Sequence, residues 1–317
     1  MTYPGHEAAW REWRAALAGT RMHHAWLLAG KRGIGKLEFA LAAARELVAE
    51  QGVRQPAEHP DIIVLTNLPA NADEEKKKAE GKPYQTKRNI AVDQIREMQQ
   101  RLTTRPTLGA RRAIIVNPAD DLEKSAANAL LKSLEEPPAG SFFLLVSHRP
   151  GRLLPTIRSR CRLVRFPEAA DDEVEAFLAR EEPQADPETR ALAVSAAEGS
   201  LQVAREFVEQ QLAPLHKLMR RILHEGDPGF ELRGALADAI GTRPARERQL
   251  AAIDLARAVL AREMRMAPRG RLPAIIEAHA ELNRLAGQAP TYNFDPGLLV
   301  MEIGSLLASA AAPRETA

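Results

Sequence analysis

Short apolar runs alternate with longer amphipathic segments through the first half of the chain. The runs consist of aliphatic and Phe residues, a composition typical of strands buried in a parallel sheet. The segments between them repeat apolar residues at helical spacing, as Val92, Ile95, Met98 and Leu102 do. Strands that alternate with helices predict an α/β fold with a parallel five-stranded sheet. The strands are expected at residues 24–29, 62–65, 113–116, 142–146 and 163–166.

The helices of this first half are bounded by recognisable signals. Pro137 and Pro138 end the helix that precedes the fourth strand. The expected helices are residues 7–18, a helix opening at the glycine-rich loop 30–37 and running to about residue 50, one from Val92, and one from about Asp121 to Glu136.

Residues 66–88 interrupt this regular pattern with a polar stretch. Its centre is a run of acidic and then basic side chains, Asp73 to Lys78, which predicts a mobile surface loop or a loose hairpin. Lys82, Lys87 and Arg88 can contact DNA phosphates, but a solvated loop is the favoured interpretation.

The second half of the chain carries helical spacing only. Three short helices are expected first, at residues 171–180, 187–198 and 200–211. Asp295 and Pro296 have the residue types of an N-cap and a first helical position, so they predict the start of the last helix. We expect three domains: an α/β domain over 1–166, a small helical domain over 167–208 and an all-helical domain over 209–317.

Composition and charge narrow the class of protein. The chain is 45% hydrophobic, which suffices for packed cores, and its net charge of +2 gives no overall attraction to nucleic acid. A single cysteine, Cys161, excludes a disulfide framework or a four-cysteine zinc site within one chain. The N-terminal segment lacks the apolar core of a signal peptide, and no stretch reaches the ~18 apolar residues of a membrane helix. We therefore expect a cytoplasmic protein without membrane contact.

The segment from Gly30 to Leu37 has the spacing of a phosphate-binding loop. Gly30 and Gly35 enclose four residues, among them Gly33, and Lys36 follows. Glycines let backbone N–H groups surround phosphates, and the lysine reaches the outer phosphates. The alternative is a strand-to-helix turn that merely needs glycine, but the expected strand before and helix after favour a phosphate loop.

Three residue types that ATP hydrolysis requires are missing around this loop. The loop should end in Ser or Thr, whose hydroxyl binds Mg²⁺, and here it ends in Leu37. The third strand is followed by Asn117 and Pro118, so its end carries neither an Asp that could hold Mg²⁺ nor a side chain that could activate the attacking water. Asp120 and Asp121 come slightly later and are expected to cap the following helix.

The stretch from Arg111 to Phe166 resembles the clamp-loader ATPases of the AAA+ superfamily. The run from Asn128 to Pro138 is similar to their signature helix, and Ser159-Arg160-Cys161 is similar to their arginine-finger motif. The chain thus combines a phosphate loop that lacks the metal-binding residues with an intact arginine-finger motif. This combination resembles in particular the delta-prime subunit family of the bacterial DNA polymerase III clamp loader. The resemblance is strong over residues 20–206 and only architectural beyond them.

This resemblance implies roles for several further positions. Arg160 would project toward the nucleotide of a neighbouring subunit; the alternative is a surface arginine in a basic loop, because Arg158 and Arg162 flank it. Ser147 falls at the position that senses γ-phosphate in active relatives. The lid arginine of active relatives is replaced by Gln202, for which Arg205 is a weak substitute. The cysteine zinc module that relatives often insert before the second strand is absent. The resemblance also implies that residues 167–208 form a lid domain and that residues 209–317 form a collar that joins neighbouring subunits; the alternative for the latter is a closed helical bundle.

The function implied is that of a non-hydrolysing clamp-loader subunit. It would need no cofactor of its own, although its degenerate phosphate loop can retain phosphate or nucleotide. Its implied partners are ATPase subunits of the gamma/tau type, a delta-type subunit and, through the complex, the sliding clamp and primer-template DNA. The alternatives are an ATP-hydrolysing gamma/tau-type motor, which the missing residues disfavour, and a free-standing nucleotide-binding regulator.

Overall fold

A computed structural model describes residues 5–19, 22–50, 54–82, 84–288 and 294–311. These residues form two compact units, and the boundary between them in the sequence lies between Ala169 and Ala170. The first unit contains the expected five-stranded sheet, in which every neighbouring pair is parallel and the strand order is β2-β3-β4-β1-β5. The strands are β1 (Ala25–Ala29), β2 (Ile62–Leu65), β3 (Arg112–Val116), β4 (Ser141–Ser147) and β5 (Arg162–Arg165).

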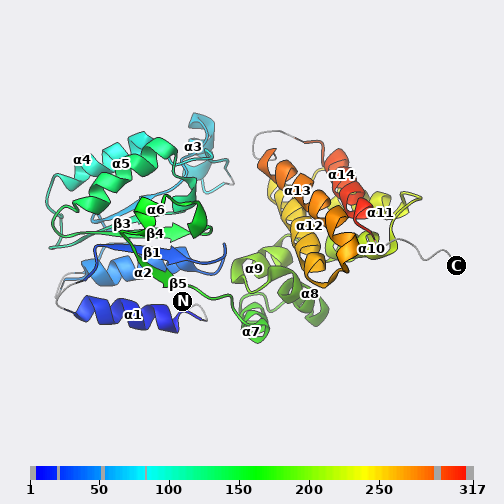
Figure 1. Cartoon of the computed structure of the whole chain (residues 1–317), viewed down its shortest axis with the longest axis horizontal. Coiled ribbons are helices and arrows are strands. Elements are labelled where there is room, and N and C mark those ends of the chain that lie inside the picture. The colour runs from blue at the N-terminus through cyan, green and yellow to red at the C-terminus, as the bar shows by residue number, and fades with distance from the viewer. Residues whose placement is uncertain (1–4, 20–21, 51–53, 83, 289–293, 312–317) are drawn as a thin grey trace. The chain divides into compact units, whose positions relative to one another are not determined.

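Helices cover both faces of this sheet (Figure 1). Successive side chains of a strand point to opposite faces of the sheet, so each face has its own apolar core. In β3, Ala113 and Ile115 face one helical layer, whereas Ile114 and Val116 face the other. The first layer contains α1 (Glu7–Ala18) and α2 (Lys36–Val48), and the second contains α4 (Val92–Leu102), α5 (Lys124–Glu135) and the short α6 (Pro155–Arg158).

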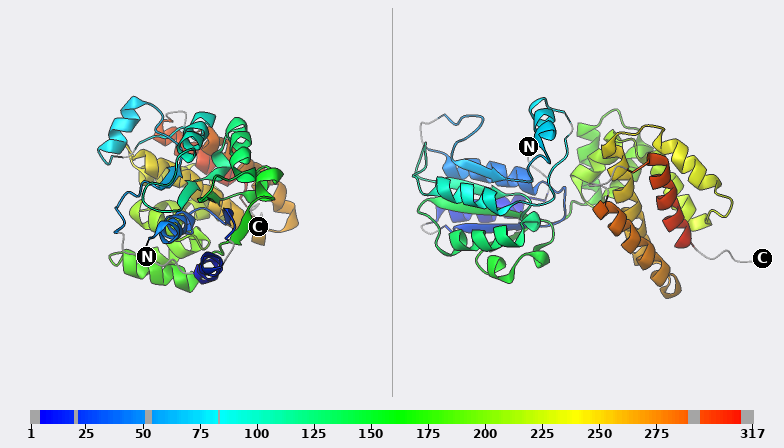
Figure 2. Two further views of the ribbon diagram at one scale, coloured as in Figure 1. Left: turned by 90° about the vertical axis from the view of Figure 1, so that its left-hand side faces the viewer. Right: turned by 90° about the horizontal axis from the view of Figure 1, so that it is seen from above.

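The polar excursion between β2 and α4 is more ordered than the predicted mobile loop. Its ends pair in antiparallel fashion at Pro69 and Thr86, as a loose hairpin would, but its tip forms α3 (Ala72–Ala79). The Asn71 side chain caps this helix by accepting from the N–H groups of residues 73 and 74. In both views of Figure 2, α3 projects away from the layered sheet.

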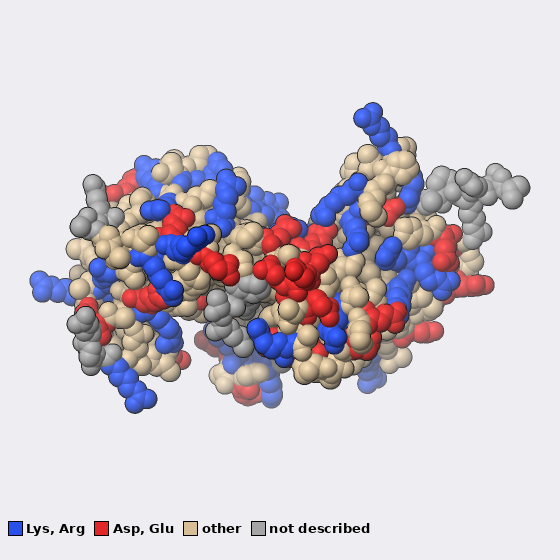
Figure 3. Space-filling view, turned by 90° about the horizontal axis from the view of Figure 1, so that it is seen from below, with Lys and Arg blue, Asp and Glu red and all other residues tan. Residues whose placement is uncertain are grey.

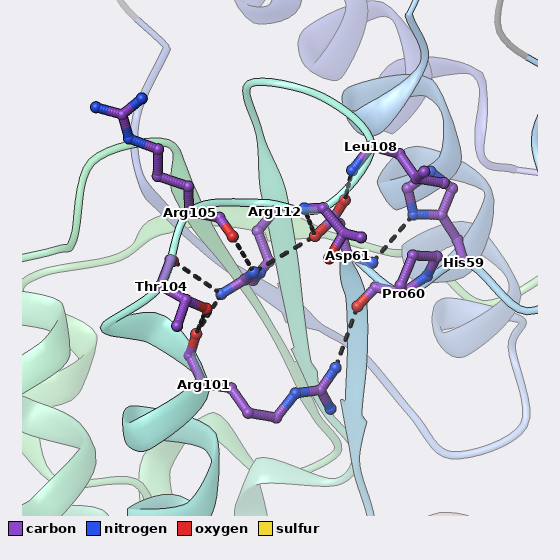
Figure 4. A network of polar contacts seen from close by, with 9 residues as sticks. His59, Pro60, Asp61, Arg101, Thr104, Arg105, Leu108 and Arg112 are labelled. Carbon is purple, nitrogen blue, oxygen red and sulfur yellow. Dashed lines mark hydrogen bonds and ion pairs between the residues drawn. The ribbon is translucent and has the colours of Figure 1, made fainter.

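A buried carboxylate fixes the connection between α4 and β3 (Figure 4). Asp61, just before β2, is fully buried and accepts from the N–H groups of Thr107 and Leu108 at 2.7 and 2.8 Å. Arg112 lies 3.5 Å from the same carboxylate and donates to the carbonyl oxygens of Arg101, Thr104 and Arg105. The ring of His59 accepts from Asp61 N–H through Nδ1 at 3.2 Å.

The second unit is entirely helical over its described residues, and α8 contacts both α10 and α12. The predicted last helix begins as expected, because the Asp295 carboxylate accepts from Leu298 N–H at 2.9 Å and Pro296 follows as the first helical residue. The division into a domain at 167–208 and another at 209–317 stays a prediction. The helices are α7 (Asp171–Glu181), α8 (Pro187–Ala197), α9 (Leu201–Glu209), α10 (Ala213–Glu225), α11 (Glu231–Ile240), α12 (Arg246–Met266), α13 (Leu272–Gln288) and α14 (Pro296–Ser309).

The surface charge is mixed, as the small net charge of the sequence suggests. On the face shown in Figure 3, Lys and Arg side chains are scattered among acidic ones and do not form one continuous basic patch. In the described part of the chain, no helix has the length and apolar character needed to cross a membrane.

Candidate functional site

The glycine-rich loop connects β1 to α2 and is shaped by its glycines. Gly33 and Gly35 have φ of +78° and +84°, a region that side chains with a Cβ rarely adopt. A Cβ at Gly30 would lie 2.7 Å from both the carbonyl oxygen of Phe166 and Cδ1 of Ile34. The turn therefore needs all three glycines, and the strand–loop–helix context expected of a phosphate loop is present.

Lys36, expected to reach phosphate, is directed at its own loop. The side chain is buried, and Nζ donates to the carbonyl oxygens of Gly30, at 2.8 Å, and Lys31. Burial lowers the pKa of Lys36 to about 8, although the nearby Asp120 carboxylate opposes this shift. The lysine thus stabilises the closed loop by satisfying two of its carbonyl groups.

The positions that should bind metal carry residues that pack or pair elsewhere. Leu37 is partly buried against the apolar layer formed by α1, α2 and the sheet. Asn117 continues β3 through its backbone, where its N–H donates to Leu65 at 2.9 Å, and Pro118 follows. Among the described residues, no group of three or more His, Cys, Asp or Glu side chains is arranged to hold a metal ion.

Asp120 was expected to cap α5, and this prediction is wrong. It lies in a 3-10 turn, Ala119–Asp121, and α5 begins later with Glu123 at its N-cap and no side-chain cap. The carboxylate instead accepts from Ser147 Oγ at 2.8 Å, His148 N–H at 2.5 Å and Arg149 N–H at 3.0 Å. Asp120 therefore joins the segment after β3 to the end of β4.

This contact engages Ser147, which falls at the γ-phosphate-sensing position of active relatives. The residue is fully buried at the end of β4, beside the start of the phosphate loop, because Gly30 N–H donates to its carbonyl oxygen at 3.3 Å. Its hydroxyl, placed to sense γ-phosphate in active relatives, donates to the chain's own Asp120 carboxylate. Donors that face phosphate in an active site are here occupied by an internal anion.

The surroundings of the Asp120 carboxylate shift the pKa values of two nearby residues, His148 and Asp121. Burial, together with the charges of Lys36, Arg32 and Arg149, lowers the pKa of His148 to about 4 even though Asp120 opposes the shift. Burial raises the pKa of Asp121, whose carboxylate accepts from Asn67 Nδ2 at 3.1 Å. Asp121, like Asp120, is therefore a bridging residue and not the predicted helix cap.

Arg160 lies at the surface of the first unit, in the turn between α6 and β5. Its side chain is 35% exposed, its Nη1 donates to the Thr156 carbonyl oxygen at 2.9 Å, and its Nη2 lies 2.7 Å from Glu135 Oε1. The flanking motif residues anchor the turn: Ser159 Oγ donates to the same carbonyl at 3.1 Å, and Cys161 packs against the core. Arg160 is thus held at an accessible edge.

Cys161 is a small packing residue, because its side chain lies partly buried against the core cluster. Burial raises the pKa of its thiol to about 12, so the thiol stays protonated near neutral pH. A nucleophilic role is therefore disfavoured.

The two residues considered for nucleotide sensing in the second unit are engaged with neighbouring carboxylates. Gln202 Nε2 donates to Glu206, and Arg205 Nε donates to Glu209, each at 2.8 Å. Arg205 also lies 3.4 Å from Glu182. The described contacts of both side chains are therefore with carboxylates of the helical unit itself.

His6 is a site residue that sequence reasoning missed. Its ring is buried, lies edge-on to Phe166 at 4.8 Å between centroids, and places Nε2 2.7 Å from the Ile34 carbonyl oxygen of the phosphate loop. No sequence motif marks this contact. Asp120 was considered only as a helix cap, although an acid soon after the third strand is also a metal-ligand candidate by position.

The strand order, the glycine loop after β1 and the arginine turn before β5 define a protein of the AAA+ clamp-loader class. The family model described as DNA polymerase III, delta subunit matches residues 5–170, more than half of the chain. The chain belongs to the DNA polymerase III delta-prime subunit family.

Individual relatives agree with this assignment. The DNA polymerase III subunit delta' of Pseudomonas aeruginosa is 36% identical over 173 residues, which cover 50% of this chain and 47% of that protein. That of Escherichia coli is 34% identical over 162 residues, 47% of this chain and 44% of that protein. The chain therefore matches about half the length of these curated relatives.

A solved structure supports the fold over nearly the whole chain. A DNA polymerase III gamma subunit-related protein from Thermotoga maritima superposes with a TM-score of 0.52 at 18% identity. The superposition covers 94% of this chain and 97% of that one. At this identity the likeness concerns the fold alone.

Proposed function

We propose that this chain is a non-hydrolysing subunit of the bacterial DNA polymerase III clamp loader. It supplies Arg160 in trans to the nucleotide of a neighbouring ATPase subunit during loading of the sliding clamp on primed DNA. The observation that carries the proposal is a contrast within one unit. The donors and acceptors of Lys36 and Asp120 are used within the phosphate-loop region, whereas Arg160, although it contacts Thr156 and Glu135, keeps 35% of its side chain exposed at the surface in an intact motif.

The chemistry left at the phosphate loop supports the non-hydrolysing part of this proposal. The loss of a well-placed base or charge-stabilising group costs roughly 10²–10⁴-fold in rate. Leu37, Asn117 and Pro118 together remove the metal-binding hydroxyl, the metal-binding acid and the catalytic glutamate. Three such losses leave no useful turnover, so the chain requires no Mg²⁺ or nucleotide as a cofactor. A phosphate group entering the loop would have to displace Lys36 from the two carbonyls.

The partner side of the proposal follows from what an arginine finger does. Its guanidinium neutralises charge that develops on the γ-phosphate of an adjacent subunit, and this is worth about 10³–10⁵-fold in well-studied cases. The partners are accordingly an ATPase subunit of the gamma/tau type, a delta-type subunit and, through the assembled complex, the sliding clamp and primer-template DNA. Because its own site distinguishes no nucleotide states, this subunit gives its neighbours a fixed surface to move against.

The test is an Arg160→Ala variant reconstituted with the ATPase and delta-type subunits, the clamp and primed DNA. We expect normal assembly and a reduced DNA-stimulated ATPase rate, with turnover at the adjacent site lowered by at least about 10²-fold. Arg158→Ala is the matched control, because Arg158 is an exposed arginine of the same turn. Full ATPase activity in a correctly assembled Arg160→Ala complex would refute the finger assignment.

A further inference from the structure

The arginine turn is attached to the rest of the unit mainly through α5. Ile157 is fully buried in the core cluster that includes Leu130 and Leu134 of α5, and Cys161 packs against the same cluster. Glu135, the last residue of α5, adds the ion pair with Arg160 at 2.7 Å. The apolar contacts fix the backbone of the turn, and the ion pair fixes the end of the Arg160 side chain.

The geometry of this ion pair leaves the guanidinium able to bind an anion. A guanidinium carries five N–H donors, and the contacts with Thr156 and Glu135 use one each on Nη1 and Nη2. The remaining donors and the 35% exposure of the side chain allow a phosphate oxygen to be bound while both contacts persist. Glu135 is itself 49% exposed, so the pair lies at the edge of the unit and not within its core.

An arginine that acts on a transition state benefits from being oriented before the reaction. A free arginine side chain has many rotamers, and each must be given up when the guanidinium aligns with phosphate. Contacts from a supporting residue reduce this loss and hold the donors near the productive geometry. Glu135 and the Thr156 carbonyl give Arg160 two such contacts, one on each terminal nitrogen of the guanidinium.

We propose that Glu135 is a positioning residue for Arg160, holding the guanidinium oriented toward the phosphate of the neighbouring subunit. The inference rests on the proposed finger function of Arg160. An ordinary surface ion pair is the simpler interpretation, and it predicts that the loss of Glu135 changes nothing in the neighbour's active site.

The experiment uses the reconstituted complex in which only the ATPase subunit next to Arg160 keeps its phosphate-loop lysine. Single-turnover and steady-state ATP hydrolysis are measured for Glu135→Ala, Glu135→Gln and Glu136→Gln. Glu136 is the matched control, because it is the next residue and is also exposed. Arg160→Ala and the double variant Glu135→Ala/Arg160→Ala complete a double-mutant cycle.

We expect Glu135→Ala to lower kcat about 2- to 5-fold, the range that corresponds to an exposed ion pair of ordinary strength, with KM unchanged. Glu135→Gln, whose amide oxygen can still accept from Nη2, should retain part of the rate, and Glu136→Gln should retain all of it. In the Arg160→Ala background, Glu135→Ala should have no further effect, which a general structural role would not produce.

The outcomes separate this inference from the proposed function. If Arg160→Ala lowers the rate but Glu135→Ala does not, or raises it, the positioning role is wrong while the finger stands. If Glu135→Ala lowers the rate equally in both backgrounds, Glu135 acts independently of Arg160 and the inference fails. If Arg160→Ala has no effect, the proposed function itself fails.

Discussion

At the scale of single residues, Lys36 and Asp120 have the residue types of an active site, but both make hydrogen bonds that stabilise the fold. Lys36 has the position of a catalytic lysine, but its amine serves the carbonyl oxygens of Gly30 and Lys31. Asp120 has the charge of a metal ligand, but its carboxylate accepts from three donors at the end of β4. Leu37 and Asn117 cannot supply the metal-binding groups of an active site, and the polar atoms of Lys36 and Asp120 are satisfied by these internal partners.

This view predicts that Lys36 matters for stability and not for turnover. Lys36→Met should leave the two loop carbonyls without their donor and lower the free energy of unfolding by about 1–3 kcal/mol. The DNA-stimulated ATPase rate of the assembled complex should stay at its normal value. Urea unfolding and complex ATPase measurements check the two parts, and Lys31→Met, which removes an exposed ion pair with Glu168, is the control. A complex that loses its ATPase activity with Lys36→Met would instead indicate a working site.

At the scale of elements, a single buried carboxylate organises the connection from α4 to β3. Asp61 holds the backbone of Thr107 and Leu108 and faces Arg112, which in turn donates to carbonyls after α4. Burial alone would raise the pKa of Asp61, but the hydrogen bonds from Leu108 and Thr107 and the charge of Arg112 outweigh it, so the pKa is lowered.

Asp61 is therefore expected to link stability to pH. Because its folded-state pKa is below the unfolded value, its stabilisation is fully present above the unfolded pKa and is lost as pH falls through the folded one. Asp61→Asn should cost about 3–5 kcal/mol near neutral pH, because it leaves Arg112 buried without a counter-charge. The difference from the unaltered chain should shrink in acid.

Urea unfolding at pH 7 and in steps below pH 4 measures this difference. Asp93→Asn removes a carboxylate that is 84% exposed and paired with Arg96, so it should change stability little at any of these pH values. A constant cost of Asp61→Asn across the whole range would show that the Asp61 charge does not contribute.

At the scale of the whole molecule, each unit has its own part in the proposed function: the sheet unit supplies Arg160, and the helical unit is expected to join the subunits. The sheet unit carries both the degenerate phosphate loop and Arg160, and each unit contains its own buried apolar residues. From the resemblance to clamp-loader subunits we expect the helices beyond residue 209 to form a collar that joins this chain to neighbouring subunits. A unit with its own core is expected to fold alone.

Separate fragments test this division. Residues 1–169 should fold with a cooperative thermal transition but fail to join the ATPase subunits. Residues 170–317 should join them without supporting the ATPase rate that the full chain supports. Size-exclusion chromatography with the partners and ATPase assays measure both properties. Assembly through the 1–169 fragment alone would contradict the assignment of the helical unit to oligomerisation.

The sequence predicted the regular elements well because their signals are local. The apolar runs gave all five strands, and Asp295 with Pro296 marked the start of α14 correctly. It was less successful where local signals compete: the acidic and basic run at residues 66–88 suggested a loop, but a well-capped helix formed there. The start of α5 was placed too early for the same reason, because Asp120 and Asp121 look like capping residues.

The sequence by itself determined the order of strands and helices, the glycine loop, the missing metal ligands and the arginine motif, since each depends on residues adjacent in the chain. Only the tertiary structure decided that Lys36 closes its own loop, that Asp120 occupies the donors of Ser147 and its neighbours, and that Glu135 holds Arg160. The physical reason is that a polar side chain takes its partner from whichever strand and helix ends the fold brings together. Asp120 and Ser147 meet because β3 and β4 are paired, although 27 positions separate them in the chain.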